Sequence, residues 1–284
     1  MGGIYWLASY PKSGNTWFRT FLKNFLSDSD QPADINELST GQIASSREWV
    51  DDVIGFDTSD LHQDEIEALR PHVYRWNSAS GPVGYHKIHD AYTLTRGGRP
   101  LVDDVATLGA VYIIRNPLDV VSSYANHYHC SIDDAITAMA DPDHAIARSR
   151  KALSNQLLQF MGTWSGHVDS WTRAPDLKLM VIRYEDMHAT PTTTFGDAVA
   201  FLGLDPDADR LQRAIAFSQF DVVAGQESVS GFRERPQRAE RFFRKGQVGE
   251  WRSALTDAQT ARVIADHGAV MSRFGYLDAR HQPV

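Results

Sequence analysis

Residues 10–17 read Tyr-Pro-Lys-Ser-Gly-Asn-Thr-Trp and lie between an apolar run, residues 4–9, and an amphipathic stretch, residues 18–26. This order predicts a buried strand, a tight turn and a helix. Backbone N–H groups at the start of a helix lack partners within it, and the helix dipole adds about half a positive charge there. Lys12 adds a full positive charge, so we expect the loop to bind a phosphate-like anion.

The loop differs from the Walker A loop of ATP-binding proteins. A Walker A loop has two glycines, and a Lys-Ser or Lys-Thr pair follows the second one. Here Lys12 comes two residues before a single glycine, Gly14. The lysine is therefore in the wrong place for ATP to be the first choice of ligand.

The remaining apolar runs predict three more buried strands, at residues 83–88, 110–114 and 177–182. Helical patterns are expected at residues 117–129, 152–171, 192–202, 207–217 and 256–274. Strands that alternate with helices indicate an α/β fold, here a P-loop-like, three-layer domain with a central parallel sheet and helices on both faces. Ligands of such sheets bind beyond the carboxyl ends of the strands, where the candidate motifs fall.

Length and composition favour one domain over residues 1–284, because no linker or repeat divides the chain. Two polar segments, residues 28–75 and 130–150, are weakly periodic. We expect them to be insertions at an acceptor site, either lids or surface loops.

Charge and cysteine content exclude several classes of protein. The net charge of -8 argues against a nucleic-acid partner, which normally needs an extended basic surface. A single cysteine, Cys130, cannot form an intrachain disulfide. No apolar run approaches the roughly 20 residues of a membrane span, and the N-terminus does not read as a signal peptide. These features predict a cytoplasmic protein with neither a nucleic-acid nor a membrane partner.

A second motif lies at residues 111–123, where an apolar run ends in Arg115-Asn116-Pro117. Asn116 and Pro117 favour a helix start, which places Arg115 at the carboxyl edge of the sheet. A guanidinium there can bind phosphate with two parallel hydrogen bonds. Ser123, two turns into the helix, can offer a hydroxyl to the same anion. The alternative partner for the arginine is Asp119.

A third motif is the sequence Phe-Arg-Lys-Gly-Gln-Val-Gly-Glu-Trp at residues 243–251, which has two adjacent cations and two glycines but no strong periodicity. Glycines let a backbone approach a ligand closely, so this segment is a candidate phosphate clamp. A solvated basic surface loop is the alternative.

Together, the three motifs resemble the sulfotransferase family that uses 3'-phosphoadenosine 5'-phosphosulfate, PAPS. Residues 10–17 are similar to its 5'-phosphosulfate loop, residues 115–123 to its 3'-phosphate segment, and residues 244–246 with 249–251 to its C-terminal clamp. The motifs occur in the family's order. The bacterial-type members, including those that modify glycopeptide antibiotics, are most similar in the loop and in overall length.

The resemblance implies which residues contact the cosubstrate. The residues expected at the 5'-phosphate are Lys12, Ser13, Gly14, Asn15 and Thr16. The residues expected at the 3'-phosphate are Arg115, Ser123, Arg244, Lys245 and Gly246. The remaining expected nucleotide contacts are Trp17, stacked on the adenine, and Tyr184, Ser218 and Phe220.

The sequence His86-Lys87-Ile88-His89-Asp90 is similar to the family's Lys-Thr-His segment, which implies that Lys87 and His89 are catalytic. Strand alternation places Lys87 and His89 on one side and His86 on the other, which favours His89 as the base. The isoleucine at 88, where a threonine is usual, is a departure from the family's pattern.

The implied reaction is in-line transfer of a sulfuryl group from PAPS to a hydroxyl or amine of a small molecule, leaving adenosine 3',5'-bisphosphate, PAP. Positioning and charge stabilisation dominate such transfers by analogy with phosphoryl transfer. His89 would take the acceptor proton, Lys12 would stabilise the leaving phosphate and Lys87 would balance charge on the sulfuryl oxygens. The residues suggest no metal site.

Two other functions remain open at this point. A P-loop-type kinase or ATPase would also need an anion loop, and Asp186 near the end of the fourth predicted strand is its candidate magnesium ligand. A non-catalytic nucleotide-binding module would keep the loop without the chemistry, although the chain has Lys12, Lys87 and His89. The acceptor is not specified, and a homodimer is left open.

Overall fold

The computed structural model describes residues 2–148, 153–235 and 239–284. The chain forms two compact units, and each is assembled from three separate stretches. Unit 1 comprises residues 1–10, 41–112 and 142–181, and unit 2 comprises residues 11–40, 113–141 and 182–284. The expectation of a single domain stays a prediction, as do the acceptor-site roles of residues 28–75 and 130–150.

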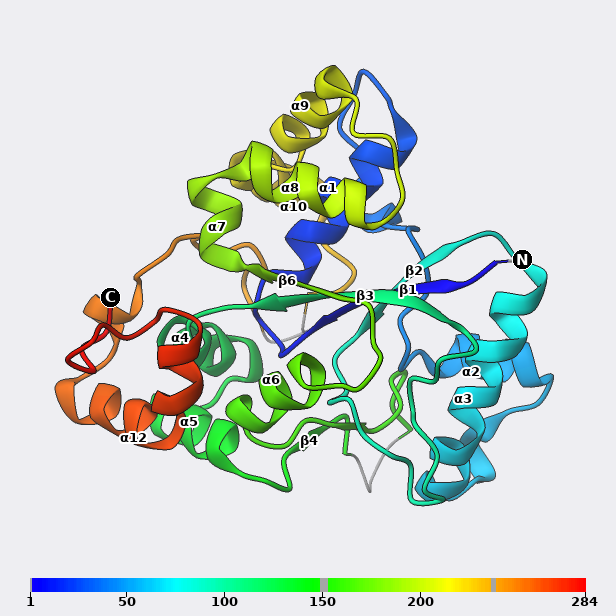
Figure 1. The fold of residues 1–284 in the computed structure, drawn as a ribbon, viewed down its shortest axis with the longest axis horizontal. Coiled ribbons are helices and arrows are strands. Elements are labelled where there is room, and N and C mark those ends of the chain that lie inside the picture. Colours follow the sequence, from blue (N-terminus) through cyan, green and yellow to red (C-terminus); the bar gives the residue numbers. More distant parts are fainter. Residues whose placement is uncertain (1, 149–152, 236–238) are drawn as a thin grey trace. The chain divides into compact units, whose positions relative to one another are not determined.

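The sheet has four parallel strands in the order β2-β1-β3-β6 (Figure 1). Their bounds are β1 (Ile4–Ser9), β2 (Gly84–Ile88), β3 (Thr107–Ile114) and β6 (Leu179–Arg183). All six residues of β1 are buried, which explains its unbroken apolar sequence. Most of the sheet lies in unit 1, and the last residues of β3 and β6 belong to unit 2. The predicted α/β class and parallel sheet are confirmed.

Unit 1 also contains helices and a small two-stranded sheet. Its elements are α2 (Arg47–Ile54), η2 (Thr58–Asp60), α3 (Gln63–Ser80), β4 (Ala145–Ile146), β5 (Gln159–Phe160) and α6 (Trp164–Thr172). Strands β4 and β5 pair antiparallel. Residues 28–75, whose periodicity is weak, therefore include two helices of unit 1.

The predicted helix at 152–171 is wrong over residues 153–163, because the helix there, α6, begins only at Trp164. Two local features set this start. Gly162 has φ 60°, outside the helical region, and the hydroxyl of Thr163 accepts a hydrogen bond from Gly166 N as an N-cap. The apolar side chains of this stretch gave a helical period, but its backbone pairs in part as β5. Residues 149, 150 and 152 of the predicted segments lie outside the described residues.

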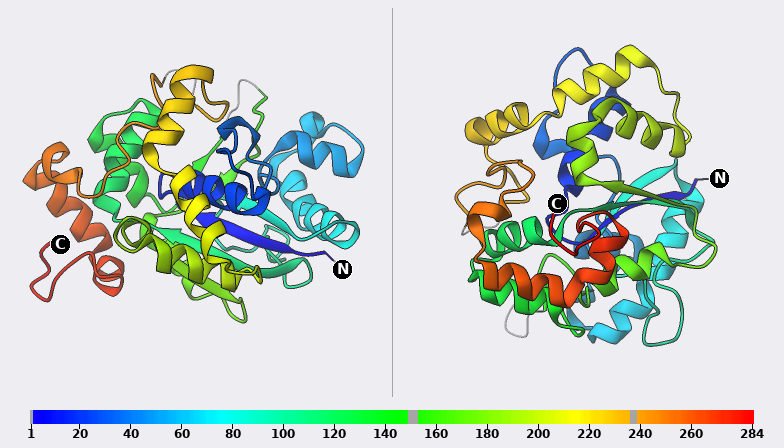
Figure 2. Two further views of the ribbon diagram at one scale, coloured as in Figure 1. Left: turned by 90° about the horizontal axis from the view of Figure 1, so that it is seen from above. Right: turned by 60° about the vertical axis from the view of Figure 1, so that its left-hand side comes forward.

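Unit 2 is mainly helical. Its elements are α1 (Asn15–Ser27), η1 (Ile35–Glu37), α4 (Pro117–Tyr128), α5 (Ile132–Ala140), α7 (Tyr184–Ala189), α8 (Pro191–Phe201), α9 (Ala208–Phe217), α10 (Phe220–Ser230), α11 (Trp251–Ala254) and α12 (Asp257–Arg273). Helix α1 packs against α9, and α12 lies along α4 and α5 (Figure 2). The helices predicted at 117–129, 192–202, 207–217 and 256–274 are confirmed within two residues at each end.

Among the described residues, no helix combines the length and the apolar character that crossing a membrane requires.

Candidate active site

The loop between β1 and α1 has the backbone shape of an anion site. Lys12 and Gly14 both have positive φ, at 69° and 105°. Gly14 is the N-cap of α1 and offers no side chain to the N–H groups of the first turn. A Cβ at Gly14 would lie 2.6 Å from Tyr184 Cδ2, so a larger residue does not fit. The hydroxyl of Ser13 is buried and has no hydrogen-bond partner, which leaves a donor for an anion.

Arg115 joins this loop to the third motif. Its Nη1 donates to the Lys12 carbonyl at 3.2 Å and its Nη2 to the Gln247 carbonyl at 3.0 Å. The guanidinium lies 4.3 Å from the centroid of the Tyr184 ring. Its Nε is buried without a partner. As predicted, Asn116 caps α4, so Arg115 is held at the end of β3.

Asp119, the alternative partner for Arg115, binds the third motif instead. Its carboxylate oxygens accept hydrogen bonds from Gly249 N at 2.7 Å and Trp251 N at 2.9 Å. Asp119 is fully buried. Residues 244–251 are called the clamp below. Helix α4 holds the clamp through Asp119, a contact that the sequence did not predict.

The two cations of the clamp converge on one carboxylate. Arg244 Nη2 lies 2.6 Å from Glu250 Oε2, and Lys245 Nζ lies 3.0 Å from Oε1. Burial opposes ionisation of Glu250, but hydrogen bonds from Arg244 and Lys245 outweigh it and lower the pKa of the carboxyl group. Gly246 has φ 59°, and a Cβ there would collide with the ring of Phe220.

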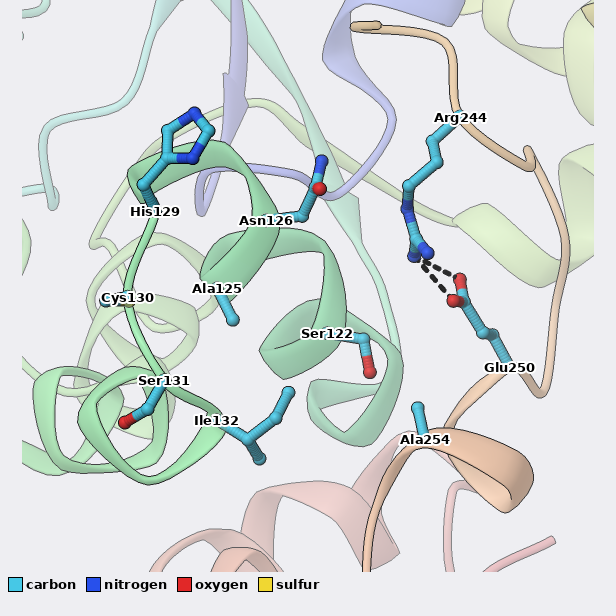
Figure 3. Close-up of a pocket in the computed structure, with 10 residues that line it drawn as sticks. All are labelled: Ser122, Ala125, Asn126, His129, Cys130, Ser131, Ile132, Arg244, Glu250 and Ala254. Atoms are coloured by element: carbon cyan, nitrogen blue, oxygen red, sulfur yellow. Dashed lines mark hydrogen bonds and ion pairs between the residues drawn. The ribbon is translucent and has the colours of Figure 1, made fainter. Parts of the chain in front are cut away.

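A cavity of about 570 Å³ opens beside the clamp (Figure 3). Arg244 and Glu250 line one side of it, and helix α4 contributes Ser122 and Ala125. The hydroxyl of Ser122 is buried without a partner, so a polar ligand can supply one. The sequence pointed to Ser123, which is half-buried on the same helix and does not line the cavity.

The expected adenine contacts lie in an aromatic cluster. The centroid of the Trp17 ring is 5.6 Å from that of Tyr184 and 4.5 Å from that of His188. No motif in the sequence indicated His188. The indole N–H of Trp17 is buried without a partner. Ser218 is buried at the end of α9, where its hydroxyl donates to the Ile215 carbonyl. The nucleotide contacts assigned to these residues stay predictions.

The side chain of Lys12 has two neighbours that the sequence did not reveal. Its Nζ lies 3.5 Å from His127 Nδ1 and 4.1 Å from the centroid of the Phe242 ring. His127 is on α4, one turn after Ser123. Only the spacing of four residues from Ser123 could have indicated that His127 shares that helix face.

In unit 1, His89 follows β2 directly and lies beside the end of β1. The strands pair Leu7 with Lys87 and Ala8 with Ile88, so Ser9 is next to His89. His89 Nδ1 is 2.8 Å from the Ser9 carbonyl oxygen. A carbonyl only accepts, so Nδ1 carries the proton and the lone pair of the neutral ring is on Nε2. This is the tautomer that a general base needs.

His86 has a different environment. It is 3% exposed, its Nδ1 accepts a hydrogen bond from Gln42 N, and its ring lies 5.1 Å from that of Trp49. Burial lowers the pKa of His86 to about 4, so the ring is neutral at pH 7. These contacts give His86 a structural role. Lys87, between the two histidines, is buried, and its backbone N–H donates to the Gln42 carbonyl.

Within the described parts of the chain, no group of three or more His, Cys, Asp or Glu side chains is arranged to hold a metal ion.

The chain belongs to the sulfotransferase domain family, because the model of that family matches residues 101–275, more than half of its length. The match contains Arg115 and the clamp, and it begins after Lys12 and His89. The predicted enzyme class is thereby confirmed, and its PAPS cosubstrate is confirmed at the level of the family.

Relatives and solved structures agree with this membership. Cytosolic sulfotransferase 16 of Arabidopsis thaliana is 24% identical, over 90% of this chain and 72% of that protein. Flavonol 3-sulfotransferase of Flaveria bidentis is 24% identical, over 90% and 78% of the two chains. Sulfotransferase 1A1 of Canis lupus familiaris is 22% identical, over 95% and 83%.

The fold is similar to that of mouse sulfotransferase SULT7A1 complexed with PAP, with a TM-score of 0.59, 19% identity and coverage of 95% of this chain and 84% of that one. Retinol dehydratase in complex with androsterone and inactive cofactor PAP gives a TM-score of 0.63, 17% identity and coverage of 94% and 80%.

Proposed function

We propose that this chain transfers the sulfuryl group of PAPS to a hydroxyl or amine of a small-molecule or natural-product acceptor. The observation that carries the proposal is the position of Arg115. One guanidinium binds the carbonyl of Lys12 in the first motif and that of Gln247 in the third. The three motifs therefore form one site in unit 2.

The chemistry of this site suits a nucleotide with phosphates at both 3' and 5' positions. Unpaired buried donors occur beside the loop, at Ser13 Oγ, and beside the clamp, at Ser122 Oγ. Each end also has its own cation, Lys12 at the loop and Arg244 at the clamp. Two separate anion sites fit PAPS better than the single phosphate chain of ATP.

The alternatives have less support. The family match argues against a kinase or ATPase, and the candidate magnesium ligand Asp186 lies 3.7 Å from Arg183 Nη1. A non-catalytic module is disfavoured by His89, because its hydrogen bond to the Ser9 carbonyl sets the tautomer that general-base catalysis needs.

In the proposed reaction, the acceptor oxygen or nitrogen forms a bond to sulfur while the bond from sulfur to the leaving phosphate oxygen breaks. His89 Nε2 takes the acceptor proton. Lys12 stabilises the negative charge that grows on the leaving 5'-phosphate, and Lys87 balances charge on the sulfuryl oxygens. Ser9, which anchors His89, precedes Lys12 by three residues in the chain.

We further propose a cytoplasmic location, and the homodimer stays a prediction. The location is supported by the cytosolic designation of the plant relative. The similarity to bacterial-type enzymes stays a prediction, because the relatives described above come from plants and a mammal.

The proposal predicts that labelled sulfate passes from PAPS to at least one member of a panel of phenols, glycopeptides and sugars. His89→Ala should lose turnover by about two to four orders of magnitude, as is typical when a positioned base is removed, and keep PAP binding. The matched control is His72→Ala, an exposed histidine on α3 of the same unit. Normal turnover in His89→Ala would exclude His89 as the base.

A further inference from the structure

The peptide that carries His89 is held from helix α6 of the same unit. His167 Nε2 lies 2.9 Å from the His89 carbonyl oxygen. One turn later, the indole N–H of Trp171 donates to the Asp90 carbonyl at 3.0 Å. Both side chains are completely buried. Helix α6 therefore fixes two consecutive carbonyls directly after β2.

The hydrogen bonds of His167 define its tautomer. The His89 carbonyl can only accept, so His167 Nε2 carries the proton. The other nitrogen, Nδ1, lies 2.8 Å from the hydroxyl of Tyr112 on β3 and accepts its hydrogen. Burial lowers the pKa of His167 to about 4, although hydrogen bonds to the backbone oppose the shift, so the ring is neutral at pH 7.

These contacts form a directed chain from Tyr112 through His167 to the His89 carbonyl. On its other side, the His89 ring donates to the Ser9 carbonyl. The base is thus fixed twice, at its main chain by His167 and at its ring by Ser9. A displacement of about 1 Å at a catalytic group can cost about a hundredfold in rate, so fixing both ends matters.

We propose that His167 is a positioning residue for the base His89 and that Tyr112 sets the tautomer His167 needs for this. The inference rests on the proposed function, in which His89 is the base. His167 itself is fully buried and acts through the His89 peptide, without touching the acceptor. Loss of its hydrogen bond frees the peptide, and the His89 ring then no longer stays on the Ser9 carbonyl.

The test uses three variants of the full chain. His167→Leu removes both hydrogen bonds at similar volume, His167→Gln keeps a donor for the His89 carbonyl, and Tyr112→Phe removes only the hydroxyl. The matched control is Tyr276→Phe, a tyrosine of unit 2 that is equally buried and whose hydroxyl donates to Glu185 Oε2 at 3.0 Å.

The first readout needs no acceptor: ¹⁵N NMR of the imidazoles reports the tautomer of each histidine. We expect His89 to be protonated at Nδ1 in the parent protein and in Tyr276→Phe, and to mix tautomers in His167→Leu. The second readout is turnover with PAPS and the acceptor from the panel. His167→Leu should lower kcat by about 10- to 100-fold, Tyr112→Phe by less, and His167→Gln should recover most of it, with PAP affinity unchanged.

An unchanged His89 tautomer and unchanged kcat in His167→Leu overturn the inference. If that variant does not fold, Tyr112→Phe decides: it must lower kcat relative to Tyr276→Phe, and equal values overturn the inference. Failure of the proposed function is distinct, because it is seen as normal turnover in His89→Ala.

Discussion

At the scale of single residues, the two histidines of the His86–His89 segment show what sequence can and cannot predict. Strand alternation separates them and favours His89 as the base. The tautomer of His89 depends on Ser9, 80 positions away in the chain, and the role of His167 depends on a contact across 78 positions. Such pairings follow from strand register and helix packing, which no local pattern specifies.

Gly14 carries a prediction at this scale. Its φ of 105° is unfavourable for a side chain, and an added Cβ meets Tyr184. Gly14→Ala should therefore destabilise the protein by about 1 to 3 kcal/mol and weaken PAP binding. Gly203→Ala is the matched control, with φ 73° and open space around the position. Urea unfolding and calorimetry check both variants.

The control variant Gly203→Ala should lose stability through backbone strain alone and should bind PAP normally. Equal PAP affinity in Gly14→Ala and Gly203→Ala would show that the shape of the loop does not matter for the nucleotide.

At the scale of elements, sequence patterns predicted the four strands and about half of the helices. The helices without a prediction are α2, α3, α5, α7, α10 and α11. The error at residues 153–163 arose because apolar periodicity does not register a glycine with positive φ or a threonine cap. The cations and glycines of the clamp identified it in the sequence, but nothing identified Asp119, which holds it in place. Asp119 was considered only as a partner for Arg115, because nothing local connects it to Gly249 and Trp251, 130 and 132 positions away.

The clamp gives a prediction about Glu250. Its carboxylate binds Arg244 and Lys245, the cations assigned to the 3'-phosphate. Glu250→Gln removes this competing charge, so PAP should bind about 3- to 10-fold more tightly and 5'-AMP should bind as before. Calorimetric titration measures both ligands. The exposed Glu240→Gln makes the same change in net charge and serves as the control.

Weaker PAP binding in Glu250→Gln would contradict this prediction. It would mean that the carboxylate orients the two cations for the ligand instead of competing with it.

At the scale of the whole molecule, the chain alternates along its sequence between two compact units. The proposed nucleotide site consists of residues of unit 2, and the proposed base and the residues that hold it belong to unit 1. Composition and apolar periodicity predicted the α/β class, but not this division. Each unit takes its residues from three distant stretches, and local patterns do not reveal such assembly.

Stability should fall with acid because both units bury neutral histidines. Burial lowers the pKa of His86, His167 and His267 to about 4, below the ordinary 6.5. Between these values the unfolded chain binds protons that the folded chain does not, so stability falls as pH decreases from about 6.5 to about 4. Each histidine contributes up to about 1.4 kcal/mol per pH unit.

Urea unfolding at several pH values in this range measures the slope. His267→Leu should reduce the slope of stability against pH by the contribution of one histidine, whereas replacing the exposed His281 should leave the slope unchanged. An identical slope in the two variants would show that His267 is protonated in the folded protein.

The most direct measurement is calorimetric binding of PAP, 5'-AMP and magnesium ATP to the parent protein. In the proposed site, one phosphate binds at Lys12 and the other at Arg244 and Lys245. PAP should therefore bind at least about tenfold more tightly than 5'-AMP, because its 3'-phosphate adds charge-assisted hydrogen bonds. PAP should also bind more tightly than ATP. Equal affinities for PAP and 5'-AMP, or tighter binding of ATP, would contradict the assignment of this chain as a PAPS-dependent sulfotransferase.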